Sequence, residues 1–346
     1  MNALRIAFYV LSSTFYILKK IITQLRKLLS TLWMTLLVLS GCGGPIQKMP
    51  ELAQEAIKLN NKGFDYYREG HLEQALENYQ KALEINRVID NRRGIAASLN
   101  NIGALYERRG NLDQALRYYQ QALEENRQAG NEVGVVANLN NIGGIYETRG
   151  DLTTAWKYYQ EALNLSEKID DDAGRAVSLN NIGHWLKQKG YYPDALRNYQ
   201  KALEIDTRLK NKAGMAIRLN NMGAVYQALG DLNKALAYYQ QALELDKQIE
   251  NLEGIAAGLM NIAEIQKTQG HLDVALDYYE RALTVNQALG NEIQTSYTLR
   301  KIAEIYQAKK EDGKAQEYYQ KALQSLPASK GEKKLIGEIQ SGNNTR

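Results

Sequence analysis

Pairs of asparagine residues recur every 40 residues along this chain, and their chemistry is suited to peptide recognition. A primary amide donates and accepts hydrogen bonds at once, so it matches the N–H and C=O groups of an extended backbone. Asparagine is also a poor residue for a helix interior, because its side chain competes with the backbone. Its recurrence therefore indicates a specific role. The residues are Asn60, Asn61, Asn100, Asn101, Asn140, Asn141, Asn180, Asn181, Asn220, Asn221 and the single Asn261.

Two roles for these amides are open at the level of sequence. In the first, they hold a peptide backbone while neighbouring small or apolar residues receive its side chains. In the second, each amide bonds its neighbour in the next unit, sets the register of the helices and contacts no ligand. The neighbouring small or apolar residues are Ala97, Ala137, Val177, Ile217 and Ala257. Further along, Arg300 and Lys301 either hold a carboxylate or form the solvated face of an end unit.

No catalytic or metal-binding pattern is visible. The three histidines, His71, His184 and His271, have no nearby cysteine or recurrent acid at metal-ligand spacing. There is no nucleophile–base pair and no phosphate-binding glycine loop. The sequence therefore predicts a non-enzymatic protein without a metal or other cofactor.

The single cysteine, Cys42, follows an N-terminal segment of unusual composition. Two apolar runs, Ile6–Leu18 and Leu28–Gly41, flank a basic stretch, and neither reaches the ~18–20 residues that span a bilayer. This order is typical of a secretory signal peptide. The sequence Leu39-Ser40-Gly41-Cys42 resembles the lipobox of bacterial lipoproteins. The resemblance implies cleavage before Cys42, acylation of its sulfur and a membrane-anchored body facing the periplasm or exterior. The alternative is an uncleaved anchor with an unmodified Cys42.

The positive charge of the chain belongs to this segment. Residues 1–41 hold five of the 43 Lys and Arg residues and none of the 39 Asp and Glu residues. The rest of the chain is therefore nearly neutral. Without a basic excess there is no electrostatic reason to expect nucleic acid as a partner.

Seven units of 40 residues follow, aligned on leucines from Leu59 to Leu299. In each unit two apolar stripes with helical periodicity predict two helices. Gly110 is expected to end the first helix and Asn111 to cap the second. We expect Gly103 to face Ala115 across the hairpin. Caps for the next first helix are predicted at Asn91, Asn131, Asp171, Asn211, Asn251 and Asn291.

The pattern of Gly103, Tyr106, Gly110, Ala115, Tyr119 and Ala122, with its copies, resembles the tetratricopeptide repeat. The resemblance implies an all-α, right-handed superhelical solenoid of about seven antiparallel helix-turn-helix hairpins. The unit is longer than the common one of that family and resembles the repeats of kinesin light chain and the LGN/Pins adaptors. In those proteins concave asparagines bind peptides, which by resemblance assigns a peptide-binding groove to Asn100, Asn101, Asn140, Asn141, Asn180, Asn181, Asn220, Asn221 and Asn261.

These expectations divide the chain into four parts. Residues 1–41 are a cleaved signal peptide, 42–50 a lipidated linker, 51–325 the repeat solenoid, and 326–346 a C-terminal cap and flexible tail. The expected function is that of a lipid-anchored scaffold that binds a protein or an extended peptide during envelope assembly or secretion. The alternative is a receptor that senses a peptide and changes its superhelical pitch on binding.

Overall fold

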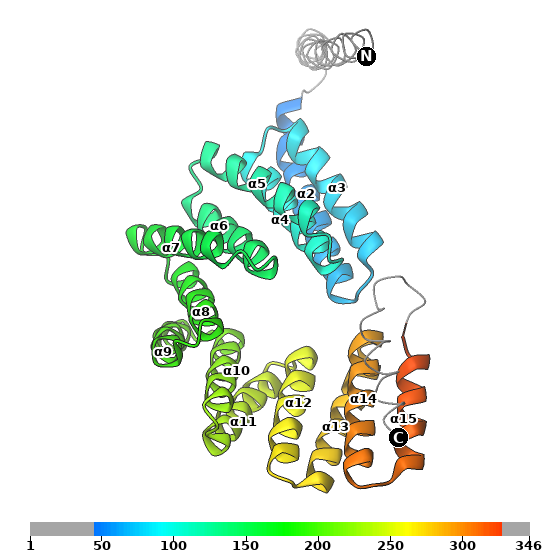
Figure 1. The fold of residues 1–346 in the computed structure, drawn as a ribbon. Helices are drawn as coiled ribbons and strands as arrows, with labels where there is room; N and C mark the ends of the chain where they lie inside the picture. Colours follow the sequence, from blue (N-terminus) through cyan, green and yellow to red (C-terminus); the bar gives the residue numbers. More distant parts are fainter. Residues whose placement is uncertain (1–44, 327–346) are drawn as a thin grey trace, which may run out of the picture. The chain divides into compact units, whose positions relative to one another are not determined.

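The computed structural model describes residues 45–326, and within that range the chain is all-helical, without a strand (Figure 1). The helices are α2 (Pro45–Arg68), α3 (Leu72–Val88), α4 (Arg92–Arg108), α5 (Leu112–Gln128), α6 (Glu132–Thr148), α7 (Leu152–Lys168), α8 (Asp172–Gln188), α9 (Tyr192–Arg208), α10 (Lys212–Ala228), α11 (Leu232–Gln248), α12 (Leu252–Thr268), α13 (Leu272–Ala288), α14 (Glu292–Ala308) and α15 (Asp312–Gln324).

Consecutive helices pack as hairpins, which confirms the predicted architecture of repeated helix pairs. Within a hairpin the two helices make the most extensive contacts, as in α6–α7, α8–α9, α10–α11 and α12–α13. The chain divides into two compact units, Met1–Ile102 and Gly103–Arg346, and the division falls within α4. The larger unit carries most of the candidate site.

The turns follow the local signals in the sequence. Gly110 has a φ of +73°, which glycine adopts without a steric penalty, and it ends α4 as predicted. The Asn111 side chain accepts a hydrogen bond from the Gln114 backbone N–H at 3.2 Å. Asn251 is the N-cap residue of α12 as predicted, but its side chain makes no capping bond. Its Nδ2 donates to Asp246 Oδ1 at 2.7 Å, as Asn211 Nδ2 does to Asp206 Oδ1 at 2.8 Å.

A buried tyrosine on each second helix organises the core of its hairpin. The residues are Tyr79, Tyr119, Tyr159, Tyr199, Tyr239, Tyr279 and Tyr319. A Cβ added at Gly103 would lie only 2.7 Å from the Tyr119 ring. Gly103 therefore makes room for Tyr119, which lies one helical turn beyond Ala115 on α5. In the first hairpin a Cβ added at the equivalent Gly63 would lie 2.7 Å from the Tyr79 ring and 3.2 Å from the backbone oxygen of Ala75, the counterpart of Ala115.

Trp156 and Trp185, which stand where other repeats carry aliphatic side chains, are half-buried. Their ring centroids lie 4.5 Å apart, and the Trp185 indole N–H donates to the Leu152 carbonyl at 2.7 Å. Two indoles in place of aliphatic side chains do not fit wholly inside this hairpin interface. They instead cover each other where α7 meets α8.

The boundaries at the two ends are only partly described. Helix α2 begins at Pro45, inside the segment 42–50 that the sequence assigned to a linker, and proline is favourable in a first helical turn. The predicted signal peptide, Cys42 and all but the first residue of the predicted C-terminal segment 326–346 lie outside the described residues. Between residues 45 and 326, no helix combines the length and apolarity needed to cross a membrane.

Candidate functional site: the inner face of the first helices

In the larger unit, the first helices of successive hairpins lie closer together than the second helices. Helix α8 contacts both α6 and α10, and α10 contacts α12, whereas the second helices of successive hairpins make no comparable contact. A stack of hairpins that is tighter on one side curves toward that side. We call the exposed sides of α6, α8, α10, α12 and α14 the inner face.

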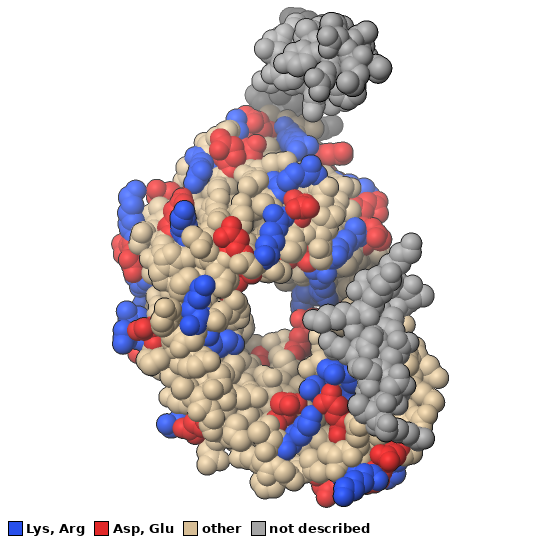
Figure 2. All heavy atoms as spheres, in the orientation of Figure 1, with Lys and Arg blue, Asp and Glu red and all other residues tan. Residues whose placement is uncertain are grey.

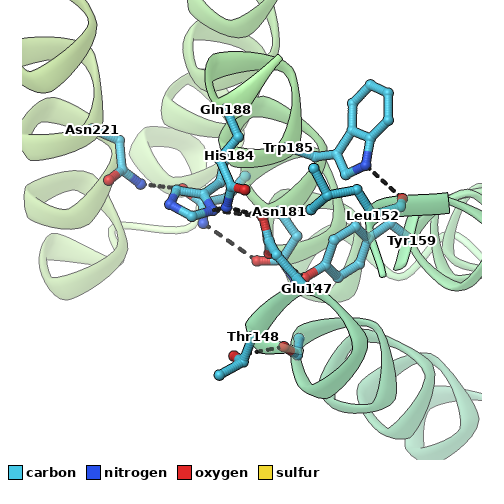
Figure 3. A network of polar contacts seen from close by, with 11 residues as sticks. Glu147, Thr148, Leu152, Tyr159, Asn181, His184, Trp185, Gln188 and Asn221 are labelled. Atoms are coloured by element: carbon cyan, nitrogen blue, oxygen red, sulfur yellow. Dashed lines mark hydrogen bonds and ion pairs between the residues drawn. The ribbon is translucent and has the colours of Figure 1, made fainter. Parts of the chain in front are cut away.

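The asparagine pairs lie on these first helices and bond from one repeat to the next. Asn181 Nδ2 donates to Asn140 Oδ1 at 3.1 Å. Asn221 Nδ2 donates to Asn180 Oδ1 at 2.8 Å (Figure 3). In the smaller unit, Asn101 Nδ2 bonds Asn60 Oδ1 at 3.4 Å. The register-setting role is therefore present in the structure.

These bonds do not exhaust the amides. A carboxamide has two N–H donors and two acceptor lone pairs, and the bond from Asn221 to Asn180 uses one N–H of Asn221. Asn140 is buried, and its amide is held in bonds to the next repeat. Its Nδ2 donates to Ser178 Oγ at 2.9 Å, in addition to the bond that its Oδ1 accepts from Asn181. The other predicted site residues are half-buried, and Asn100 and Asn101 belong to the smaller unit.

The bond between repeats is absent at Asn220. Where the pattern places a bond between Asn261 and Asn220, none forms; Asn220 Oδ1 is buried without a hydrogen-bond partner. Asn261 is half-buried on α12. It is therefore the predicted site residue whose amide is least committed to holding repeats together.

Apolar side chains lie exposed beside the amides, as the peptide-binding hypothesis requires. Val177 is 43% exposed on α8 and Ile217 is 50% exposed on α10. They precede Asn181 and Asn221 by one helical turn, which places amide and apolar group on the same side of each helix. Ala137 and Ala257 extend this row with small exposed residues.

Glu147 is the centre of a polar network that sequence reasoning missed (Figure 3). It accepts bonds from Tyr159 Oη at 2.6 Å and Gln188 Nε2 at 2.7 Å, and His184 Nδ1 lies 2.8 Å from its Oε1. Burial is the main cause that raises the pKa of the Tyr159 hydroxyl above its ordinary range, and the hydrogen bond to Glu147 is the second. A carboxylate with three partners is poorly placed to act as a general base, so this network is structural.

His184, which has no acid at metal-ligand spacing in the sequence, thus contacts Glu147. Glu147 and His184 are 37 residues apart. The sequence did contain a signal for this contact: Glu147 and His184 lie on the first helices of adjacent repeats, and their separation is close to the 40-residue repeat length. Lys187 lies near the same carboxylate; burial lowers its pKa, and Glu147 opposes that shift.

Arg300 and Lys301 have counter-ions within the chain. Arg300 Nη1 lies 3.1 Å from Glu304 Oε1, and Lys301 Nζ lies 3.4 Å from Glu264 Oε2. Burial disfavours the charged form of Lys301, but Glu304 and Glu264 outweigh it and raise the pKa of this residue. The two cations are therefore part of an internal network on the inner face of α14.

Charge and metal ligands define no further site. Figure 2 shows Lys and Arg interspersed with Asp and Glu over the face in view, with neither sign dominant. In the described residues, no group of three or more His, Cys, Asp or Glu side chains is placed to hold a metal ion.

Repeated helical hairpins with a polar and apolar inner face define a helical-repeat protein. Its residues 54–124, 135–208, 175–248, 214–288 and 254–328 match the tetratricopeptide repeat, and the chain belongs to this family. No curated protein matches the chain.

Several solved structures share the fold. BtubC (BKLC) from P. vanneervenii is 21% identical over 62% of this chain and 90% of its own, with a TM-score of 0.54. The apo form of RapI is 17% identical over 78% of this chain and 97% of its own, with a TM-score of 0.57. A Rap protein complexed with Competence and Sporulation Factor is 14% identical over 84% of this chain and 99% of its own, with a TM-score of 0.54.

Proposed function

We propose that the unit Gly103–Arg346 is a non-enzymatic scaffold that binds an extended peptide or protein segment on its inner face. The observation that carries this proposal is the exposure of Val177 and Ile217 beside the amides of Asn181 and Asn221. Isolated exposed apolar residues are common, but a row of them beside hydrogen-bonding groups matches the alternation of a peptide's backbone and side chains. A Rap protein of similar fold forms a complex with Competence and Sporulation Factor, which is consistent with this use of the fold.

The asparagines have different roles because they make different hydrogen bonds. Asn140 and Asn180 each accept a hydrogen bond from an asparagine of the next repeat and so hold neighbouring repeats together. Asn181 and Asn221 each donate one N–H to the preceding repeat and keep a second N–H for a peptide. Asn181 Oδ1 accepts one bond, from Asn180 Nδ2 at 3.4 Å, and keeps one lone pair. Apolar side chains of the peptide then lie over Val177 and Ile217, where each buried methylene contributes about 0.8 kcal/mol.

Peptides selected from a random phage-displayed library on the wild-type chain test this proposal. Their affinities are then measured by fluorescence anisotropy. Ile217→Asp is expected to weaken binding at least about tenfold, because it places a charge where an apolar side chain must lie. Val274→Asp is the matched control, since Val274 is 47% exposed on the second helix α13. Equal affinities for Ile217→Asp and the wild type, or equal losses in both variants, would contradict the proposal.

We further propose that the scaffold is anchored to a bacterial membrane through acylated Cys42 and acts in envelope assembly or secretion. The support is the lipobox-like Leu39-Ser40-Gly41-Cys42 after a basic and apolar leader. Two or three acyl chains hold a protein stably at a membrane, where one is marginal. In bacteria fed an alkyne analogue of palmitate, the wild-type chain should be labelled and sediment with membranes. A Cys42→Ser variant that is still labelled would contradict acylation at this residue.

A further inference from the structure

In two repeats of the larger unit, lysine occupies the position that elsewhere accepts a tyrosine hydroxyl. Tyr119 Oη donates to Glu107 at 2.7 Å, and Tyr239 Oη donates to Gln227 at 2.8 Å. A lysine ammonium has no lone pair, so it cannot accept this bond. A repeat with lysine there must therefore satisfy its tyrosine and its lysine in another way. At 40-residue intervals the residues at this position are Glu107, Glu147, Lys187, Gln227, Lys267 and Gln307.

The repeat that contains Lys267 has a carboxylate for each of these groups. Tyr279 Oη donates to Glu264 Oε2 at 2.6 Å. Lys267 Nζ lies 2.7 Å from Glu304 Oε2. Glu304 lies on α14, the first helix of the next repeat, and its side chain is 22% exposed. A lysine at this position thus reaches the next first helix and pairs with a carboxylate near the surface.

The repeat that contains Lys187 has neither carboxylate. Ala224 stands at the place of Glu304, and His184 stands where the tyrosine would find its acceptor. Tyr199 Oη is buried without a hydrogen-bond partner. Among residues 45–326, no carboxylate lies within ion-pairing distance of the Lys187 ammonium.

The charge of Lys187 is therefore not balanced by a close partner in this part of the chain. Glu147 acts on it electrostatically but is bonded by Tyr159 and Gln188. Burial lowers the pKa of Lys187, as expected for a cation that has lost part of its hydration without gaining a close counter-ion. A carboxylate added beside it would offset that loss.

The place of the missing carboxylate is on the inner face rather than in the core. Ala224 is half-buried, and it follows Asn221 and Ile217 by about one and two helical turns. The three residues therefore lie along one side of α10. The methyl group of Ala224 does not fill the region that the side chain of Glu304 fills in the other repeat, where its end is partly exposed. A peptide that covers Ile217 and Asn221 passes over this region.

We propose that an acidic side chain of the bound peptide lies over Ala224 and pairs with Lys187. This inference rests on the proposed function of the inner face. The peptide carboxylate makes with Lys187 the ion pair that Glu304 makes with Lys267. Such a bond to a half-buried ammonium is stronger than a pair between freely solvated side chains, so one acid in the peptide contributes to selectivity as well as to affinity.

Synthetic peptides with amidated C-termini test this pairing, because every carboxylate in them belongs to a side chain. Their sequences come from the phage selection on the wild-type chain, and most of them should contain Asp or Glu. Replacing that acid by its amide should weaken binding to the wild type at least about tenfold. The same replacement should not weaken binding to Lys187→Gln.

The variant Lys187→Gln separates peptide recognition from stability. Gln227 and Gln307 accept the hydroxyl bonds of their tyrosines, so a glutamine at residue 187 gives Tyr199 an acceptor. The melting temperature of this variant should equal or exceed that of the wild type, although its affinity for acidic peptides falls. Lys201→Gln is the matched control, since it removes an exposed lysine from the second helix α9 and should bind every peptide as the wild type does.

A second variant, Ala224→Glu, supplies the carboxylate from within the chain. Replacing the peptide acid by its amide should no longer weaken binding to this variant, because Lys187 already has a partner. A preference for the acid that persists in Ala224→Glu overturns the location over Ala224. If this variant fails to fold, the response of Lys187→Gln still decides whether the acid pairs with Lys187.

Two outcomes overturn the pairing and leave the proposed function intact. In the first, peptides that depend on Ile217 bind the wild type equally well with the acid or with its amide. In the second, loss of the acid weakens binding to Lys187→Gln as much as to the wild type, which assigns the acid to another cation. The proposed function itself fails by a different result, namely equal affinities for Ile217→Asp and the wild type.

Discussion

Arg218 and Asp206 form an ion pair, with Nε 3.1 Å from Oδ2, at a position where other repeats use neutral side chains. Burial lowers the pKa of Arg218, and the carboxylate of Asp206 opposes this shift. Both groups lose their hydration when the hairpins stack, so the pair is held in place mainly because neither partner can be left alone. The neutral pairs of other repeats, such as Asn126 with Asn138, make the same connection without that penalty.

Replacing only Arg218 should therefore lower the free energy of unfolding far more than replacing both Arg218 and Asp206. Arg218→Ser is expected to lower the free energy of unfolding by about 3–5 kcal/mol, because it leaves a buried carboxylate unpaired. The double variant Arg218→Ser with Asp206→Asn recreates the combination of Asn86 and Ser98 and should recover most of this loss. Chemical denaturation monitored by circular dichroism measures both values. Equal losses in the single and double variants would show that the packing of Arg218 matters rather than its charge.

Asp246 should make stability depend on pH. Burial raises its pKa in the folded chain, against the effect of the Asn251 bond. The folded state then binds the proton more tightly than the unfolded state, so stability falls as pH rises from the unfolded pKa, about 3.9, through the higher folded pKa. Asp246→Asn should stabilise the chain by about 1 kcal/mol at pH 7, and this advantage should vanish below about pH 4. Urea denaturation across that range measures it; an advantage independent of pH would contradict the mechanism.

Two buried tyrosines should respond oppositely to loss of their hydroxyl groups. Tyr159 Oη donates to Glu147, whereas Tyr199 Oη is buried without a hydrogen-bond partner. Tyr159→Phe should cost about 1 kcal/mol, and Tyr199→Phe should be neutral or stabilising, because it removes an unsatisfied polar group. The difference arises because Lys187 stands at the place equivalent to Glu147. Thermal denaturation of both variants compares them, and equal losses would indicate that Tyr199 has a partner such as an enclosed water molecule.

Asparagines that bond a neighbouring repeat should contribute more to stability than asparagines that do not. Asn181→Ala removes the donor to the buried Asn140 and should cost about 1–2 kcal/mol of stability. Asn261→Ala removes no bond of this kind and should change stability by less than about 0.5 kcal/mol. Equilibrium unfolding measures both. If the two variants are equally destabilised, Asn261 also bonds a neighbouring repeat, contrary to the structure.

Turns between hairpins contain strained residues that glycine should relieve. Lys210 has a φ of +56°, and Gly130 occupies the equivalent turn with a φ of +61°. Lys210→Gly should stabilise the chain by about 1 kcal/mol, since a left-handed conformation is costly for residues with a Cβ. Gly130→Ala is the reverse control and should destabilise by a similar amount. The melting temperatures of the two variants measure both changes. A lower melting temperature for Lys210→Gly would mean that the extra entropy of the unfolded chain outweighs the relief of backbone strain at residue 210.

Local structure in this chain could be predicted because it depends on neighbours in sequence. The 40-residue period, the helical stripes, the turn at Gly110 and the cap at Asn111 all follow from spacing within one unit. Repetition in register then implied stacking, since a single hairpin cannot bury both of its faces. Hence the helical-repeat architecture was correct.

Contacts between units depended on side-chain reach, which spacing does not encode. Only the folded chain showed that Gly103 accommodates Tyr119, that His184 contacts Glu147 and that Asn251 donates a hydrogen bond to Asp246. The asparagine pairs had two possible partners in sequence, and the close approach of adjacent first helices brought Asn181 to Asn140 and Asn221 to Asn180. Residues within a helical turn were determined by the chain's own periodicity, whereas residues 37 to 41 apart met according to how closely the hairpins pack.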